Sequence, residues 1–399
     1  MRSLSRAGSV IAVLLAIECL DELVYGTGEA ARPMIRTDLG MSYAQIGLLL
    51  SVPAVVGGVL EVLIGVLGDT RRRRALILTG GVFFCLSLAG TALCRSFVQM
   101  LACLLVFFPA SGAFVSLSQA SLMDHAPDRR EQNMARWALA GSAGVVAGPL
   151  LLAAAGRLGI GWRGVLAGYA AVSAAMWLAA LSSRIATARP ADRPDGLLGG
   201  LREAARLAVT PRVLRWLLLL AASDLMLDIF LGFLALYFVD AVRIGDEGAA
   251  LAVALWSAIG LIGDALLIPL IERVRGLAYL RVSAAAVGIL FPTFLLVPSV
   301  AAKLCALALL GLTNAGWYSI LKAQLYASVP ARSGTVMALG QVTVWLQALV
   351  PLAIGLLAHR AGIATAMWIL MLGPIALLLG LPRSHGTGRR AGPEGSVSE

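Results

Sequence analysis

The stretch Ser9–Gly26 reads "SVIAVLLAIECLDELVYG" and places an apolar run directly before three carboxylates. The run from Ser9 to Ile17 is as apolar as a membrane segment, and Glu18, Asp21 and Glu22 follow within five positions. A carboxylate at the centre of a bilayer costs about 2.5–3.5 kcal/mol on insertion scales. The stretch therefore indicates a membrane helix whose acids belong to a functional site.

The composition of the whole chain agrees with a membrane protein. Of the 399 residues, 59% are hydrophobic and 14% are charged, and the mean hydropathy is +0.87. A soluble domain is nearer to roughly 45–50% apolar and about 25% charged. The formal charge of +10 does not indicate a nucleic-acid partner, because the basic residues follow the topology described next. We expect an all-α integral membrane protein surrounded by a lipid bilayer.

Apolar runs between polar breaks predict twelve transmembrane helices, since about 20 residues span the hydrocarbon. They lie near 9–30, 43–67, 75–94, 97–120, 133–156, 163–182, 213–238, 249–271, 278–298, 301–325, 334–358 and 363–381. The chain thus divides into a six-helix bundle (1–182), a linker (183–211) with an amphipathic helix, a second six-helix bundle (212–382) and a disordered tail (383–399).

The basic residues predict the orientation. With both termini cytoplasmic, 24 of the 32 Lys and Arg residues lie on the cytoplasmic side, as the positive-inside rule requires. We expect a multi-pass monomer in a plasma membrane, such as a bacterial inner membrane.

The two halves repeat each other. Glu61 and Asp264 lie 203 positions apart, and Glu18 and Glu22 match Asp224 and Asp228 at a spacing of 206. Internal repeats of this kind are typical of transporters that hold substrate between the repeats, near the midplane. The chain is therefore expected to be pseudo-symmetric and not an enzyme.

Acidic residues within the predicted spans form the candidate proton and substrate site. They are Glu18, Asp21, Glu22, Glu61, Asp224, Asp228 and Asp264. Crowded carboxylates in a low-dielectric, water-accessible cavity can bind protons near neutral pH and attract a cation when ionised. The alternative is structural, with the acids pairing with buried bases or capping kinks. We assign no metal ligands and no cofactor, and we expect the proton gradient to supply the energy.

The segment "GVLGDTRRRRAL" (65–76) resembles the loop signature of the major facilitator superfamily, with Gly65, Leu67, Asp69, Arg73 and Arg74 in matching positions. Thr70 and Arg72 depart from that signature. The resemblance implies that Asp69 helps to lock a cytoplasmic gate. In "GSAGVVAGPLLLAA", the residues Gly144, Gly148 and Pro149 are similar to the antiporter motif of exporters in this family.

The first two helices also resemble the fosmidomycin-resistance-type branch of drug exporters. Phe108 stands where such exporters often carry an arginine, which leaves proton coupling to the acids above. In the family fold, helices 1, 4, 7 and 10 line a cavity. Further polar and aromatic candidates for that cavity are Gln119, Asn314, Trp317, Tyr318, Gln341, Trp345 and Gln347.

These features together predict a proton-coupled antiporter that exports small cationic or amphiphilic organic molecules by alternating access. Two alternatives keep the same fold: a divalent-metal exporter, favoured by the carboxylates, and a proton-coupled uptake carrier. An intramembrane enzyme or a sensor without transport are alternatives of other classes. The segment "LIGD" lacks the first glycine of an intramembrane protease motif, since Leu261 stands there.

Overall fold

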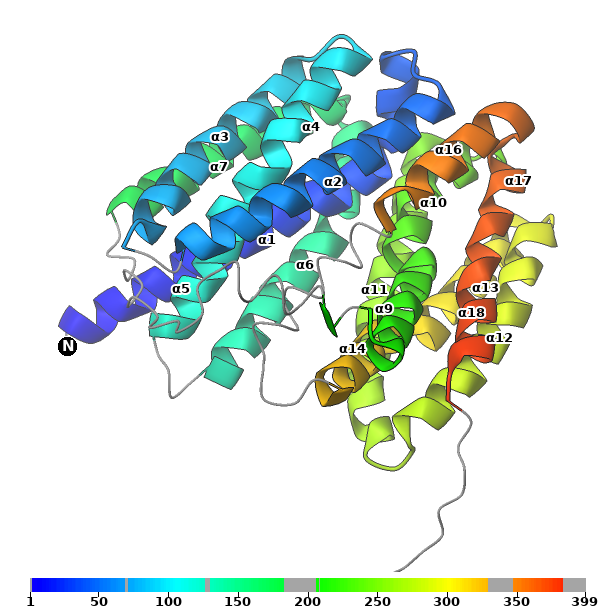
Figure 1. Cartoon of the computed structure of the whole chain (residues 1–399). Coiled ribbons are helices and arrows are strands. Elements are labelled where there is room, and N and C mark those ends of the chain that lie inside the picture. Colours follow the sequence, from blue (N-terminus) through cyan, green and yellow to red (C-terminus); the bar gives the residue numbers. More distant parts are fainter. Residues whose placement is uncertain are drawn as a thin grey trace, which may run out of the picture.

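The computed structural model describes residues 2–68, 71–125, 130–182, 206–207, 209–328 and 347–382, and its elements are helices. The described part of the N-terminal half contains eight elements before the linker (Figure 1). They are α1 (Arg2–Asp38), α2 (Tyr43–Gly68), α3 (Arg73–Leu93), α4 (Phe97–Ser111), the π-helical turn η1 (Gly112–Ser116) with α5 (Leu117–His125), α6 (Arg130–Arg157) and α7 (Trp162–Ser182).

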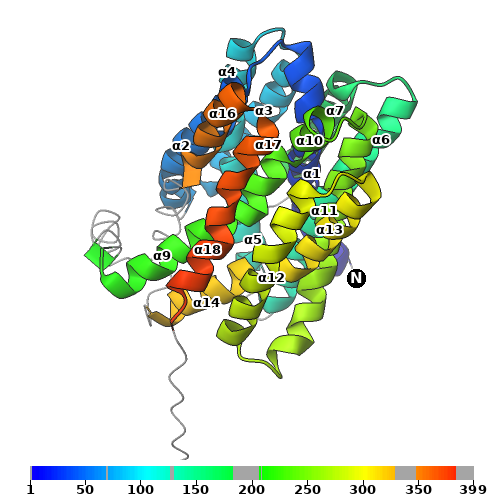
Figure 2. The ribbon, with the colours of Figure 1, turned by 90° about the vertical axis from the view of Figure 1, so that its right-hand side faces the viewer.

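The C-terminal half follows the same plan and lies beside the first half (Figures 1 and 2). Its elements are α9 (Pro211–Asp224), the π-helical turn η3 (Leu225–Ile229), α10 (Phe230–Asp240), α11 (Asp246–Ile271), α12 (Gly276–Leu296), α13 (Val300–Asn314), α14 (Trp317–Ser328), α16 (Val350–Ala361), α17 (Ile363–Ala366), the 3₁₀ turn η4 (Met367–Met371) and α18 (Leu372–Gly380).

Ten helical segments among the described residues are long and apolar enough to cross a membrane. Helix α1 carries too many charged residues to count among them, and α16 is shorter. Helix α1 also runs to Asp38, well beyond the expected end near residue 30. The first part of the span expected over 334–358, most of the predicted linker helix and the tail from 383 onward lie outside the described residues.

Local sequence signals account for several helix ends. At the start of α2, Gln45 N–H donates to Ser42 Oγ over 3.2 Å, and Ser42 N–H donates to Gln45 Oε1 over 2.8 Å. This reciprocal capping satisfies two backbone donors that would otherwise lack a partner. Ser96 and Ser299 cap α4 and α13 in the same way through one hydroxyl each.

Helices α1 and α6 pack backbone against backbone. A Cβ atom at Gly144 would lie 2.5 Å from Cys19 O, one at Gly148 would lie 2.6 Å from Leu23 O, and one at Gly26 would lie 2.5 Å from Val145 O. Such separations leave no room for a side chain, so the small residues permit this close packing. Pro149 lies in the same contact, beside Gly26.

The two halves meet at the end of the bundle where α1 ends and α11 begins, which we call the far end. There Arg36 of α1 pairs with Asp240 of α10 over 2.7 Å, and Tyr43 O–H donates to the same carboxylate. Helices α2 and α16 also pack there, where Leu352 N–H donates to Ser51 Oγ over 3.0 Å. Arg157 of α6 pairs with Glu247 of α11.

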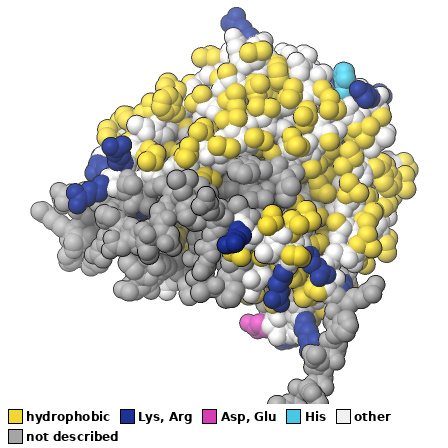
Figure 3. All heavy atoms as spheres, viewed as in Figure 1, with side chains coloured by type: hydrophobic (Ala, Val, Ile, Leu, Met, Phe, Trp, Pro, Cys, Tyr) yellow, Lys and Arg dark blue, Asp and Glu magenta, His cyan; other side chains and the backbone are white. Residues whose placement is uncertain are grey.

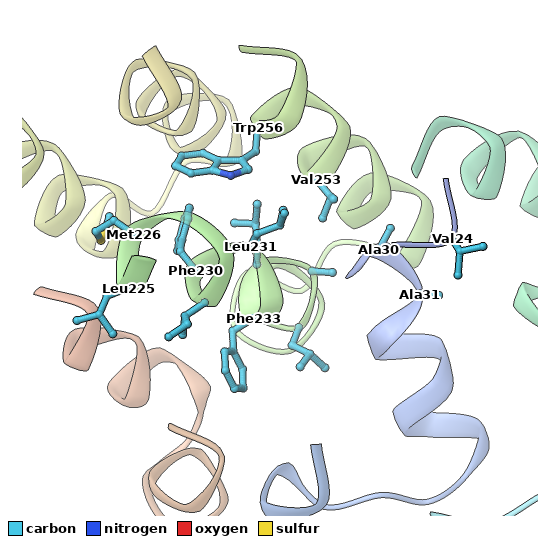
Figure 4. Close-up of a cluster of buried hydrophobic side chains, with 14 of the residues drawn as sticks. Val24, Ala30, Ala31, Leu225, Met226, Phe230, Leu231, Phe233, Val253 and Trp256 are labelled. Carbon is cyan, nitrogen blue, oxygen red and sulfur yellow. The ribbon is translucent and has the colours of Figure 1, made fainter. Parts of the chain in front are cut away.

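A hydrophobic cluster joins the halves below these polar contacts. Figure 4 shows Val24, Ala30 and Ala31 of α1 opposite side chains of η3, α10 and α11, which are Leu225, Met226, Phe230, Leu231, Phe233, Val253 and Trp256. On the outer surface, hydrophobic side chains cover most of the described face, with basic side chains toward its edges (Figure 3). This distribution suits a molecule embedded in lipid.

Candidate transport site

Three acids lie on one face of α1, as their spacing predicts. Glu18 is buried, and its carboxylate lies close to the Trp137 side chain of α6. Gly141 of α6 packs on this carboxylate, since a Cβ there would lie 2.8 Å from Glu18 Oε1. Glu22 is half-buried one turn farther along α1, beside Gly144.

Asp21 contacts the fourth span, which consists of α4, η1 and α5. Ser111, the last residue of α4, donates its hydroxyl to Asp21 Oδ1 over 2.9 Å. Glu61 of α2 lies close enough to interact electrostatically with Asp21, and it accepts a hydrogen bond from Ser116 Oγ over 3.1 Å. The π-helical turn η1 therefore lies between these two carboxylates.

The seventh span consists of α9, η3 and α10, and its two acids, Asp224 and Asp228, lie at the π-helical turn η3. Asp224 ends α9, and Asp228 is part of η3, where Phe230 N–H donates to Leu225 O five residues earlier. The two residues are four positions apart, about one helical turn, and their carboxyl groups interact electrostatically. The Tyr25 phenol of α1 also lies close to Asp228.

These contacts unite five acids from both halves, which we call the acid cluster: Glu18, Asp21, Glu22, Asp224 and Asp228. Glu22 of the N-terminal half interacts electrostatically with Asp228 of the C-terminal half. The Tyr25 side chain is 37% exposed and Asp228 is exposed, although protein surrounds both. Asp21, Glu22 and Asp224 are partly exposed, so water can reach acids of both halves.

Sequence reasoning did not include Tyr25, Glu29 or Arg32 among the site residues. Glu29 is buried in the structure, and the Arg32 guanidinium pairs with it and donates to Gly232 O of α10 over 2.5 Å. Both lie in α1, which continues past the expected span end. The spacing of residues 18, 22, 25, 29, 32 and 36 follows one face of a single helix and could have revealed them.

Asp264 is separate from the acid cluster. It is exposed on α11, and its carboxylate accepts a hydrogen bond from Gly316 N–H over 2.9 Å at the junction of α13 and α14. Among the described residues, the ion pairs involve Glu29, Asp38, Asp124, Asp240 and Glu247 and none of the seven predicted acids.

The predicted cavity residues have varied surroundings. Asn314 is buried and donates to Met226 O of η3 over 2.6 Å, and the Trp317 indole is fully buried and donates to Ser283 of α12 over 2.8 Å. Trp317 therefore packs between helices in this conformation. Tyr318 is half-exposed beside Lys322. Gln119 contacts Met134, Gln347 is partly exposed, and Gln341 and Trp345 lie outside the described residues.

The predicted gating residues make contacts within the N-terminal half. Arg73 is buried and binds Gly68 O and Asp124, and Arg74 binds Leu181 O. Gly65 has open space where a side chain would be, and Asp69 lies outside the described residues. Gly144, Gly148 and Pro149 form the α1–α6 contact described above.

The described residues contain no group of three or more His, Cys, Asp or Glu side chains placed to hold a metal ion.

Two helical halves that bring carboxylates together where they meet are typical of a membrane transporter. The family model of the Major Facilitator Superfamily matches residues 25–350, and the chain belongs to this family. It is a membrane transporter and not an enzyme.

Solved structures share the fold at low sequence identity. A bacterial homologue of the human lysosomal transporter Spinster, in an inward-facing and occupied conformation, matches with a TM-score of 0.77 and 14% identity, covering 94% of this chain and 95% of the other. The nucleoside transporter NupG matches with a TM-score of 0.74 and 15% identity, covering 94% and 98%. The POT family transporter PepTSo matches with 0.68 and 16%, covering 93% and 96%. The curated proteins contain no match.

Proposed function

We propose that the protein is a proton-coupled antiporter that exports small cationic or amphiphilic organic molecules by alternating access. The observation that carries the proposal is the acid cluster, in which carboxylates of both halves that are partly or fully accessible to water lie close together. A cation between Glu22 and Asp228 would contact both halves at once. Aromatic neighbours such as Tyr25 favour organic cations over hydrated metal ions.

Competition between protons and the cation would drive the exchange. Protonation neutralises the carboxylates and weakens their hold on the cation, and deprotonation restores it. The positive-inside pattern favours a cytoplasmic side at the end where the chain begins, with the far end outside. The contacts of Arg36, Tyr43 and Ser51 would then close the outer side in this conformation, and rocking of residues 1–182 against 212–382 would break them.

The test uses purified protein in liposomes that contain a pH-sensitive dye. An inward proton gradient is imposed and tetraethylammonium, ethidium, Mn²⁺ and a neutral drug are added in turn. We expect an organic cation to move protons in the wild type, and both Glu22→Gln and Asp228→Asn to stop this movement. Glu272→Gln is the matched control, because Glu272 is exposed at the end of α11 and not in the cluster.

Each result has a clear meaning. Proton movement with Mn²⁺ alone would replace the proposal with metal export. Proton movement that survives both substitutions would assign the cluster acids a structural role. Reversal of the gradient dependence, with substrate moving inward together with protons, would make the protein an uptake carrier.

A further inference from the structure

Glu61 and Asp264 occupy matched positions in the two halves, and each faces an irregularity in a neighbouring span. Glu61 of α2 faces η1 in the fourth span, and Asp264 of α11 faces the junction of α13 and α14 in the tenth. Adding the same 203 to the residue numbers of the fourth span aligns Gly112 with Ala315 of the tenth span, which consists of α13 and α14. The two irregularities therefore lie at the same place in the repeat.

In the C-terminal half the tenth span is broken between Asn314 and Trp317. Gly316 has φ +73°, a conformation that favours glycine. Its N–H donates to the Asp264 carboxylate, and Ala315 O accepts a hydrogen bond from Tyr279 O–H of α12 over 3.0 Å. Two neighbouring helices thus satisfy the backbone groups that the break exposes, as buried backbone groups require.

The break separates two parts of the span that have different neighbours. Helix α13 packs on α11 and α12, whereas α14 packs mainly on α9. A polar cap at such a break stabilises one bent geometry. Its loss would leave the Gly316 N–H without a partner and free the bend to change.

In the N-terminal half the fourth span widens into η1 instead of breaking. Pro109 of α4 has no N–H to donate, which disturbs the helical hydrogen bonds close to this turn. Ser116 of η1 donates to Glu61, and a Cβ at Gly112 would lie 3.5 Å from Glu61 Cγ. Glu61 therefore contacts both ends of the irregular turn.

The residue before each irregularity contacts the helix that bears the cluster acids. Ser111 donates to Asp21 of α1, and Asn314, which is 203 positions later, donates to Met226 O of η3. Each irregularity thus contacts the acid-bearing span on one side and Glu61 or Asp264 on the other side. Movement of α1 or η3 would therefore displace groups that contact the irregularity directly.

We propose that Glu61 and Asp264 are positioning residues that hold matched bends in the fourth and tenth spans, and that they do not carry the transported proton. Glu61 lies beside Asp21 of the acid cluster and Asp264 lies apart from it, and the proposal gives both a role different from that of the cluster acids. Such a role requires an oxygen acceptor at the side chain and does not require a group that ionises.

The chemistry of substitution distinguishes the two roles. Asp264→Asn keeps a carbonyl oxygen that accepts from Gly316 N–H but cannot release a proton. Asp264→Leu keeps the approximate shape and removes the acceptor. Glu61→Gln and Glu61→Leu form the equivalent pair in the other half, and Asp228→Asn serves as the reference for loss of a cluster acid.

The first readout is independent of any substrate. Spin labels at Leu309 of α13 and Ala323 of α14, both exposed, report the bend in full-length protein whose five cysteines have been replaced. We expect Asp264→Asn to keep the wild-type distance distribution and Asp264→Leu to shift or broaden it by several ångströms. An unchanged distribution in Asp264→Leu would overturn the proposal.

The second readout is ethidium-driven proton movement in liposomes, which rests on the proposed function. We expect Asp264→Asn and Glu61→Gln to stay near the wild-type rate and the leucine variants to lose about tenfold. Loss of proton movement in Asp264→Asn with ethidium exchange intact would make Asp264 a proton carrier and refute the proposal.

If Asp264→Leu does not fold, Tyr279→Phe removes the other cap of the break and is expected to alter the label distances.

If neither ethidium nor tetraethylammonium moves protons in the wild type, the proposed function fails while the distance measurement still decides the bend. The two conclusions can therefore fail separately.

Discussion

Glu22 of α1 and Asp228 of η3 interact electrostatically, and this contact crosses from one half of the molecule to the other. Tyr25 lies one turn after Glu22 on the same helix, and its phenol lies close to both carboxylates. The phenol is therefore within reach of acids from both halves. Rocking of the halves would change its distance to Asp228.

Tyr25→Phe should slow transport without unfolding the protein. A hydrogen bond to a charged group contributes about 1.5–3 kcal/mol, so we expect coupled proton movement to fall about tenfold. Thermal unfolding should change little, because the ring and its packing remain. Tyr169→Phe is the matched control, since the Tyr169 phenol bonds Thr27 within the N-terminal half and makes no hydrogen bond to the described residues of the other half. A Tyr25→Phe variant that transports at the wild-type rate would contradict the role of this phenol.

A disulfide across the far end should lock the conformation described here. Ser51 of α2 and Leu352 of α16 are in hydrogen-bond contact, so cysteines at these two positions are close enough to test for a bridge. In a background without the native cysteines, we expect oxidation to stop transport and dithiothreitol to restore it. Each single cysteine variant provides the control. Undiminished transport by the cross-linked protein would show that the far end need not open.

Gly148→Leu should disrupt the contact between α1 and α6. Its side chain would meet Leu23 O and the Thr27 backbone, and overpacking of this kind costs about 1–3 kcal/mol or more. We expect a clear loss of thermal stability, measured by fluorescence-detected size-exclusion chromatography after heating. Gly168→Leu in α7 is the control, because a Cβ there meets nothing within 4 Å. Equal stability of the two variants would argue against this packing.

The two lysines should differ in their importance for stability. Lys303 is buried, and its Nζ donates to Phe294 O, Leu295 O and Tyr237 Oη, near the C-terminal end of α12. Lys303→Met leaves these acceptors without the ammonium group, at a cost of about 1–3 kcal/mol in unfolding free energy. We expect a lower unfolding temperature and an unchanged transport rate per folded molecule. Lys322→Met, which removes a less buried lysine beside Tyr318, should leave the unfolding temperature near that of the wild type.

Hydropathy and internal repetition were sufficient to predict the plan of two helical halves, and the resemblance of residues 65–76 to a loop signature predicted the family. The face shared by Glu18 and Glu22 followed from helical periodicity, and their proximity to Asp224 and Asp228 followed from the repeat. The length of α1 was missed because Arg32 and Arg36 look like the start of a loop, whereas in the folded chain they pair with Glu29 and Asp240.

The separation of Asp264 from the other acids could not be predicted from spacing. It depends on a break at Gly316, and an isolated glycine in an apolar run does not by itself indicate a positive φ. The burial of Trp317 has the same origin, because the break determines which neighbour its indole meets. The sequence pattern specifies which residues share a face of a regular helix. It does not specify which neighbours those residues meet beyond a break in the helix.

The glycine contacts between α1 and α6 have a mechanical consequence. With no layer of side chains between the two backbones, α1 cannot slide or rotate against α6 without steric clash, so the two helices must move as one rigid unit. This unit carries Glu18 and Glu22 in its middle. At its far end, Arg36 of α1 and Arg157 of α6 bind two different elements of the opposite half. A small tilt produced by a change of charge at the acids would therefore strain two separated contacts simultaneously, which favours an all-or-none opening over a gradual one.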